Sequence, residues 1–110
     1  IYSLSLHDAF PCVMLEGKLS SRVVMRPFDE FIAEERKEGT TSFLLDFTKV
    51  IFICSNTLST LAKHLRNFEE EGCQMFIINP REDVLHSIEV VSLHTKIGIC
   101  SSCEEALELI

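Results

Sequence analysis

Hydrophobic residues alternate with polar ones at the start of the chain and recur at helical spacing further on. Alternation over residues 2–6, a turn over 7–11 and an apolar run over 12–15 predict two strands joined as an antiparallel hairpin. Apolar side chains three and four positions apart over 24–38 predict the first helix, and Gly39 is suited to end it. The acidic residues between these apolar positions are expected to face away from the core.

Short apolar runs alternate with helical patterns over the rest of the chain. A helix is expected to begin after Cys54, with Ser55 or Asn56 as its cap, a buried stripe that starts at Leu58, and Gly72 at its end. The other predicted elements are strands over 43–47, 73–78 and 97–100, a helix with Pro80 in its first turn and apolar positions from Val84 to Val91, and a terminal helix over 104–110. A second apolar piece over 50–53 leads into Cys54.

This order of elements is that of an α/β fold. After the hairpin, strands and helices alternate, which favours parallel strands joined by right-handed crossovers. We therefore predict a small mixed β-sheet, made of an N-terminal hairpin plus parallel strands, packed with about four helices. The length suits one core and the chain has no repeat or linker, so residues 1–110 are expected to form a single domain.

Charge and composition exclude several classes of function. The chain has 110 residues, with ten Lys and Arg against seventeen Asp and Glu, for a formal net charge of −7. So acidic a chain lacks the positive surface that nucleic acids and anionic membranes attract, and neither is an expected partner. No apolar run approaches the roughly 18 residues of a bilayer span, so direct membrane insertion is not expected. Five cysteines, an odd number, fit thiols in a reducing, cytoplasmic location better than a disulfide framework.

Two loops lie where an α/β sheet usually binds ligands or partners, at the carboxyl ends of strands and the starts of helices. They are Cys54 to Thr57 and Asn79 to Glu82. The first places small polar residues directly after the most apolar stretch of the chain. A helix cap alone would also account for those residue types.

The segment around the first loop resembles a known family signature. Residues 44–58, Leu-Leu-Asp-Phe-Thr-Lys-Val-Ile-Phe-Ile-Cys-Ser-Asn-Thr-Leu, are similar to the core signature of STAS domains, the family of anti-sigma factor antagonists and of sulfate-transporter C-terminal domains. Residues 15–19 resemble the family's L-x-G-x-L strand. The stretch from Gly72 to Pro80 and the terminal Glu-Glu-Ala-Leu follow in the family's order. The resemblance spans nearly the whole chain.

The resemblance implies a non-enzymatic regulatory domain that acts by protein–protein contact. Family members bind a partner, often a histidine-kinase-like anti-sigma factor with serine kinase activity, through the loop at this helix start. Phosphorylation of the Ser before the motif's Gly separates the two proteins. A phosphate there adds about −1.5 to −2 charges to the contact without melting the helix, because a helix N-terminus tolerates negative charge.

This chain departs from the signature at the switch itself. Cys54 replaces the motif's Asp, Asn56 its phosphoacceptor and Thr57 its Gly, while Ser55 and Leu58 match. Asn cannot accept a phosphoryl group, so one hypothesis is a domain that stays in the unphosphorylated-like state. The other is that Ser55, Thr57 or Ser59 has become the acceptor. We favour the first, because a β-branched Thr in place of Gly would crowd an approaching kinase.

The helix after the loop is a candidate partner face. Ser59, Lys63 and Arg66 share one side, with His64 and Asn67 beside them, and form a cationic island in an acidic protein. In the family this helix lines the interface, and Asp46 lies beside the switch. The alternatives are an ordinary solvated helix face and an Asp46 that only caps the next loop.

Other residue patterns carry weaker signals. Cys100 and Cys103 form a C-x-x-C pair, but redox folds place such a pair at a longer helix early in the chain. A zinc site would need two more ligands, and His94 is the only candidate close in sequence. None of the four histidines has an acid or nucleophile partner visible in the sequence, and the chain has neither a Gly-x-Ser-x-Gly elbow nor a Walker loop. We expect no enzyme, no catalytic residue, no metal and no cofactor.

Two alternative functions remain open at this stage. One is the STAS subunit of a transporter or lipid-trafficking complex, docked through the same helix. The other is a small-anion or nucleotide sensor that uses the helix starts at Ser55 and Pro80. The partner's identity and the oligomeric state are not readable from the sequence.

Overall fold

The computed structural model describes residues 2–7, 10–20 and 22–109, with only the backbone described for 2–7, 10–11 and 22–24. The chain runs through β1 (Tyr2–His7), β2 (Phe10–Leu19), α1 (Arg22–Lys37), β3 (Ser42–Ile53), α2 (Ser55–Glu71), β4 (Gln74–Ile78), α3 (Glu82–Val90), the 3-10 turn η1 (Leu93–Thr95), β5 (Gly98–Cys100) and α4 (Cys103–Leu109). The predicted order of strands and helices is confirmed.

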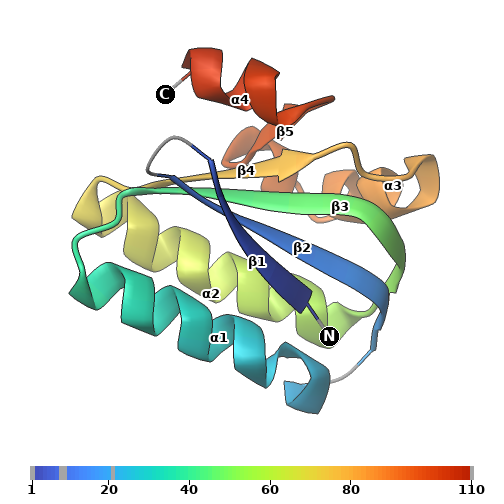
Figure 1. Ribbon diagram of the computed structural model, residues 1–110. Coiled ribbons are helices and arrows are strands. Elements are labelled where there is room, and N and C mark those ends of the chain that lie inside the picture. Colours follow the sequence, from blue (N-terminus) through green and yellow to red (C-terminus); the bar gives the residue numbers. More distant parts are fainter. Residues whose placement is uncertain (1, 8–9, 21, 110) are drawn as a thin grey trace.

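The described strands form one mixed sheet in the order β1-β2-β3-β4-β5 (Figure 1). β1 and β2 pair antiparallel, which confirms the predicted hairpin, and β2 to β5 pair parallel. The two apolar runs predicted as separate pieces, 43–47 and 50–53, are both parts of β3. β3 stays continuous because it keeps pairing with β2 as far as Leu19 and Ile53, through two shifts of register.

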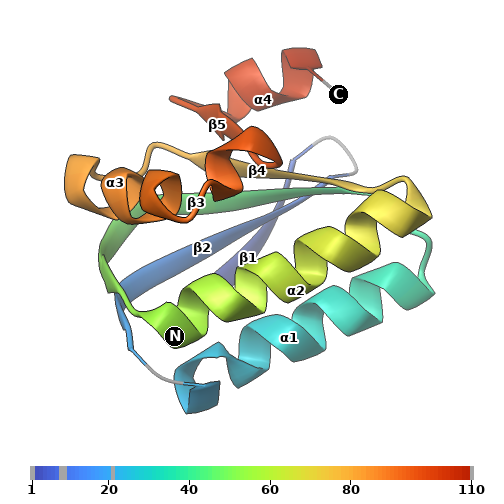
Figure 2. The ribbon, with the colours of Figure 1, turned by 180° about the vertical axis from the view of Figure 1, so that it is seen from behind.

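The two faces of the sheet are covered unequally. α1 and α2 lie side by side on one face, and α4 lies on the other (Figures 1 and 2). The larger core fills the α1/α2 face, where Leu45 and Phe47 of β3 meet the helix residues Phe28 and Leu61, and Ile88 of α3 joins them. A smaller cluster lies under α4. Successive strand residues point to opposite faces, so Leu44 belongs to this second cluster.

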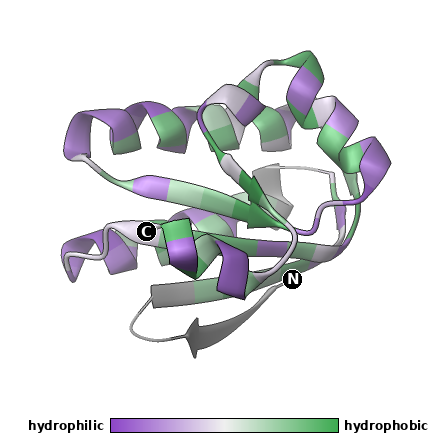
Figure 3. Ribbon diagram, turned by 90° about the horizontal axis from the view of Figure 1, so that it is seen from above, coloured by the Kyte–Doolittle hydropathy of each residue, from purple (hydrophilic) through white to green (hydrophobic). Residues whose placement is uncertain are grey.

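Helix ends and helix faces follow the predicted pattern closely. Gly72 adopts the left-handed conformation (φ 72°) that ends α2, and its N–H donates to the carbonyl of Phe68. Leu61, Leu65 and Phe68 are buried as expected, with Leu58 partly buried. Hydrophobic and hydrophilic residues alternate along the helices, as an amphipathic helix on a sheet requires (Figure 3).

Two expectations about α3 are wrong. Pro80 lies before the helix, which begins at Glu82 with Arg81 as its N-cap. Asn79, in the left-handed region (φ 51°), and Pro80 instead turn the chain out of β4. Val91 is 47% exposed, because α3 ends at Val90 and Ser92 (φ 63°) redirects the chain so that Leu93 is buried in its place.

Candidate functional site

The candidate loop is a tight junction between β3 and α2. Cys54 has extended backbone (φ −107°, ψ 175°) and is the N-cap of α2, and its carbonyl accepts the first helical hydrogen bond from the N–H of Leu58 at 3.1 Å. Ser55 and Asn56, expected as caps, are instead the first two helical residues. The helix begins at Ser55, one residue before the start that a Ser55 cap would give, because a hydrogen bond to the end of β2 fixes the backbone of Cys54.

The acceptor of this hydrogen bond is the carbonyl of Leu19, the last residue of β2. It accepts hydrogen bonds from the N–H of Cys54 at 3.2 Å and from the hydroxyl of Thr57 at 2.5 Å. Thr57 is fully buried. Its β-branched side chain therefore points into the protein. The expectation that this side chain would crowd an approaching kinase is wrong. The same burial makes its hydroxyl the least accessible of the alternative phosphoacceptors.

Cys54 occupies the position of the motif's Asp, and its thiol has a lowered pKa. Burial raises the pKa of the Cys54 thiol, but its hydrogen bonding with the backbone and side chain of Thr57 and with the backbone of Asn56 outweighs the effect of burial, so the pKa is lowered overall. The sulfur lies 3.7 Å from the Thr57 hydroxyl oxygen. A helix N-terminus favours an anion in this way, whether carboxylate or thiolate.

The first turns of α2 display polar side chains between two shallow hollows. Ser55, Asn56 and Ser59 are exposed. Asn56 and Ser59 line a polar hollow of about 280 Å³ together with Asp29, Thr60 and Lys63. On the other side, a mostly apolar hollow of about 230 Å³ is lined by Ser55, Leu58, Ser59, Ala62, Val91 and Leu93. This second hollow depends on η1, which the sequence pattern did not reveal.

The predicted cationic island on α2 is smaller than expected. Lys63, Arg66 and Asn67 are exposed, and neither cation has an ion pair among the described residues. His64, however, is buried. Its Nε2 lies 2.6 Å from Oδ1 of Asp29, and its ring meets Phe28 edge-on at 5.5 Å. His64 therefore joins α2 to α1 and is not part of the island. Asp29 was expected to face away from the core, but it contacts His64 instead.

Asp46 does not share a face with Lys63 and Arg66. It lies within β3, paired with Ile78 of β4, and Ile78 belongs to the cluster under α4. Paired residues of parallel strands point to the same face, so Asp46 lies on the side of the sheet opposite α2. Its Oδ1 accepts hydrogen bonds from the N–H and hydroxyl of Thr48 at 2.9 and 2.6 Å. Asp46 orders the strand locally and lies outside the candidate partner face.

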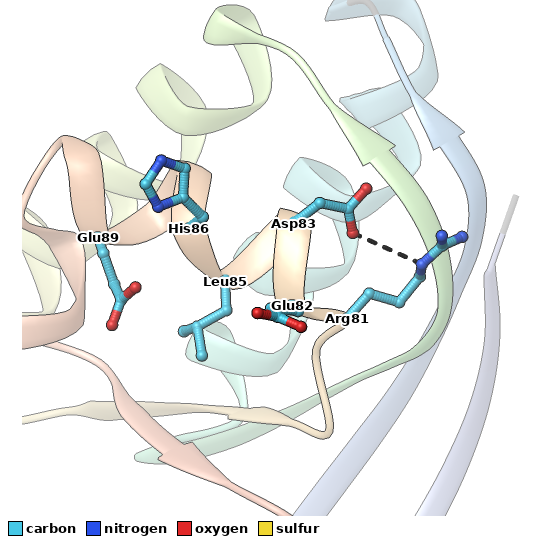
Figure 4. A pocket seen from close by; sticks show the side chains of 6 residues that line it. All are labelled: Arg81, Glu82, Asp83, Leu85, His86 and Glu89. Atoms are coloured by element: carbon cyan, nitrogen blue, oxygen red, sulfur yellow. Dashed lines mark ion pairs between the residues drawn. The ribbon is translucent and has the colours of Figure 1, made fainter.

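The second candidate loop opens into a groove along α3. A hollow of about 610 Å³ is lined by Arg81, Glu82, Asp83, Leu85, His86 and Glu89, and the Nε of Arg81 lies 3.5 Å from Oδ1 of Asp83 (Figure 4). Two acidic residues in the first turn of α3 oppose an anion at this helix start. The structure thus disfavours the anion-sensor alternative at Pro80.

Among the remaining residues, two cysteines make a contact that the sequence analysis did not predict. The sulfur of Cys103 lies 3.4 Å from that of Cys12 on β2, and Cys100 is buried in the same cluster. His86 and His94 are exposed, and the side chains of His7 and Phe10 lie outside the described residues. In the described part of the chain, no group of three His, Cys, Asp or Glu side chains could hold a metal ion. No described helix is long and apolar enough to cross a membrane.

The structure is a small α/β domain, and exposed polar side chains lie at the start of its second helix, α2. The family model for the STAS domain matches residues 4–106. The chain belongs to the STAS domain family. No curated protein matches the sequence as a relative.

Solved structures share the fold at low sequence identity. A candidate anti-sigma factor antagonist from Thermotoga maritima is 19% identical, with 99% of this chain and 93% of that chain covered at a TM-score of 0.88. An anti-sigma factor antagonist from Mycobacterium paratuberculosis is 18% identical, with 100% and 92% covered at 0.80. The phosphorylated form of the Bacillus cell fate determinant SpoIIAA is 16% identical, with 98% and 97% covered at 0.76. At these identities the likeness shows the fold.

Proposed function

We propose that residues 1–110 act as one non-enzymatic STAS domain that binds a regulatory protein through the α2 face. By the α2 face we mean Ser55, Asn56, Ser59, Lys63 and Arg66 with the apolar hollow beside them. The observation that carries the proposal is the exposure of this polar helix start directly against an apolar hollow. An apolar centre with a polar rim is the ordinary anatomy of a protein interface.

A kinase-like anti-sigma factor is the partner we propose. The structures similar in fold include anti-sigma factor antagonists, and one of them, SpoIIAA, was solved in a phosphorylated form. Lys63 and Arg66 add a chemical criterion, since exposed cations without ion pairs in an acidic chain favour a partner with acidic groups at the contact.

The charge on Lys63 offers a direct test of the α2 face. We expect Lys63→Glu to weaken binding of the anti-sigma factor about 10-fold or more, because it places a negative charge opposite acidic groups. The matched control is Lys37→Glu at the far end of α1, which makes the same change in net charge at a residue whose ion pair with Glu34 is fully surface-exposed. Titration calorimetry with the purified anti-sigma factor of the source organism gives both affinities. Equal weakening by the two variants, or binding by neither the wild type nor the variants, would contradict the proposal.

We further propose that the domain is not switched off by phosphorylation. Asn56 is exposed at the acceptor position, and its amide cannot take a phosphoryl group. With the anti-sigma factor and ATP, the wild-type chain should show no phosphoryl adduct by intact mass, whereas Asn56→Ser should gain one and release the partner. A stoichiometric adduct on the wild type would instead assign the acceptor to the exposed Ser55 or Ser59 and overturn this proposal.

A further inference from the structure

Cys12 lies close to two cysteines from the other end of the sequence, on the sheet face covered by α4. Cys12 lies on β2, Cys100 on β5 and Cys103 at the start of α4. They pack with Leu44, Phe76, Ile78, Ala106 and Leu107 in the smaller apolar cluster. Figure 1 shows α4 crossing over the sheet on the side away from α1 and α2. The final helix of the described chain is thus held on the sheet by few side chains, several of them cysteines.

Within this cluster Cys103 contacts Cys12. Their sulfur atoms are 3.4 Å apart although the residues are 91 positions apart in sequence. A disulfide needs sulfur atoms about 2.05 Å apart. The approach required is therefore little more than an ångström, and a short helix of seven residues is an element that can make it. The C-x-x-C spacing in the sequence pairs Cys103 with Cys100, whereas the contact in the structure is with Cys12.

The three thiols differ in their exposure to solvent, and one of them has a raised pKa. Cys103 is partly exposed, whereas Cys12 and Cys100 are 6% and 3% exposed. Burial, and to a lesser extent the charge of Glu105, raise the pKa of Cys100. A thiolate is the nucleophile in disulfide exchange, so burial and a raised pKa make Cys100 a poor nucleophile. A reagent from solution meets Cys103 first, and the sulfur in contact with it is that of Cys12.

We propose that Cys12 and Cys103 form a redox-sensitive dithiol, oxidised by small-molecule disulfides such as glutathione disulfide to a bond that fixes α4 on β2. The Cys103 thiolate attacks one sulfur of glutathione disulfide, breaks its S–S bond and releases one glutathione. The Cys12 thiol loses its proton and attacks the Cys103 sulfur of this mixed disulfide, releasing the second glutathione. Two thiols lose two electrons in total, one glutathione disulfide gains them, and the two thiol protons pass to the two glutathiones.

The effect of this bond is local to the α4 face. It lies on the side of the sheet opposite the α2 face, so partner binding is expected to be the same in both redox states. Motion of α4 away from the sheet is what the bond prevents. The proposal therefore stands independently of the proposed function.

The test uses the whole chain incubated with glutathione disulfide, quenched with acid, and alkylated in denaturant. We expect a product that has lost two hydrogens and carries three alkylated cysteines in place of five. Trypsin separates the thiols usefully, because Cys12 lies in peptide 1–18 and both Cys100 and Cys103 lie in peptide 97–110. A Cys12–Cys103 bond links these two peptides. Backbone amides of α4 in the oxidised product should exchange hydrogen at least about 10-fold more slowly than in the reduced protein.

Matched variants decide the assignment. Cys100→Ser and Cys73→Ser should leave the link intact, whereas Cys103→Ala, at a partly exposed position, and Cys12→Ala should each abolish it. A bridge within peptide 97–110, a glutathione adduct on Cys103 that does not resolve, or no loss of hydrogen would overturn the dithiol. A link formed without slower exchange in α4 would overturn its fixing role.

Discussion

Cys54 and Thr57 both depart from the family motif, and both make hydrogen bonds at the start of α2. Cys54 stands where the family has Asp and lies at the helix N-terminus with a lowered pKa. Thr57 stands where the family has Gly, and its hydroxyl reaches the carbonyl of Leu19. Both residues connect α2 to the end of β2. The loop is thus fixed by two hydrogen bonds to one carbonyl at the end of β2.

The lowered pKa of Cys54 predicts an ordered reactivity among the thiols. Cys54 should react with iodoacetamide at lower pH than Cys73, whose pKa is raised by burial and by Glu71 against the opposing effect of Arg36. The thiolate fraction of each cysteine rises as the pH passes its pKa, so the Cys54 rate levels off first. Mass spectrometry of tryptic peptides 50–63 and 67–81 separates the two.

Thr57→Val supplies the control for this order. It removes a hydrogen bond to the Cys54 sulfur and should shift the Cys54 profile to higher pH. Thr60→Val makes the same change of side chain one turn further on and should leave the profile in place. A Cys54 profile at or above that of Cys73 would contradict the prediction.

A polar contact joins α1 to α2, although the sequence pattern placed one of its residues, Asp29, on the solvent side of its helix. Asp29 and His64 meet between the helices, and their side chains are 35% and 9% exposed. Further along, Arg36 of α1 pairs with Glu71 of α2 at 3.2 Å. Each helix taken alone is a well-formed amphipathic pattern. Which polar residues face the neighbouring helix is set by how the two helices lie together.

Asp29→Ala is predicted to destabilise the protein by about 1–3 kcal/mol, because it leaves the buried Nε2 of His64 without its partner. Urea denaturation followed by circular dichroism measures the change. Glu30→Ala, at the exposed neighbouring position, should alter the free energy of unfolding by less than about 0.5 kcal/mol. Equal effects of the two substitutions would show that the contact carries no stability.

Periodicity predicted the strands and helices well where one face of each is buried. Leu61, Leu65 and Phe68 of α2 and the run 43–47 of β3 are examples. It failed at junctions. The start of α3 after Arg81 and the exposure of Val91 follow from left-handed backbone at Asn79 and Ser92, which are ordinary polar residues in the sequence. Their conformation is decided by where β4 and β5 must be joined, not by local propensity.

The β5 edge of the sheet has no room for a side chain at one position. On the α4 face, β5 lies so near its neighbour that a Cβ atom at Gly98 would come within 2.6 Å of Cε1 of Phe76. Gly98 and Phe76 are paired residues of β5 and β4, so the ring of Phe76 occupies the space above Gly98. Close packing of this edge therefore needs a glycine, a requirement invisible in the sequence alone.

Gly98→Ala is predicted to destabilise the protein by about 1–3 kcal/mol through overlap with the Phe76 ring. Thermal and urea unfolding of Gly98→Ala, Phe76→Leu and the double variant measure the coupling. The double variant should be more stable than the sum of the single effects implies, because a smaller side chain at position 76 makes room for the new methyl group. Strict additivity would contradict the overlap.

The order of strands and helices, the α/β class and the likeness to STAS domains all follow from hydrophobic period and a local motif, because both are written in consecutive residues. The exposed Ser55, Asn56, Lys63 and Arg66 also lie where helical spacing puts them. The inward turn of Thr57, the separation of Asp46 from the α2 face, the contact of Asp29 with His64 and that of Cys12 with Cys103 required the folded chain. Each joins elements far apart in sequence, and their distance is set by how helices pack on the sheet, a property that no stretch of consecutive residues contains.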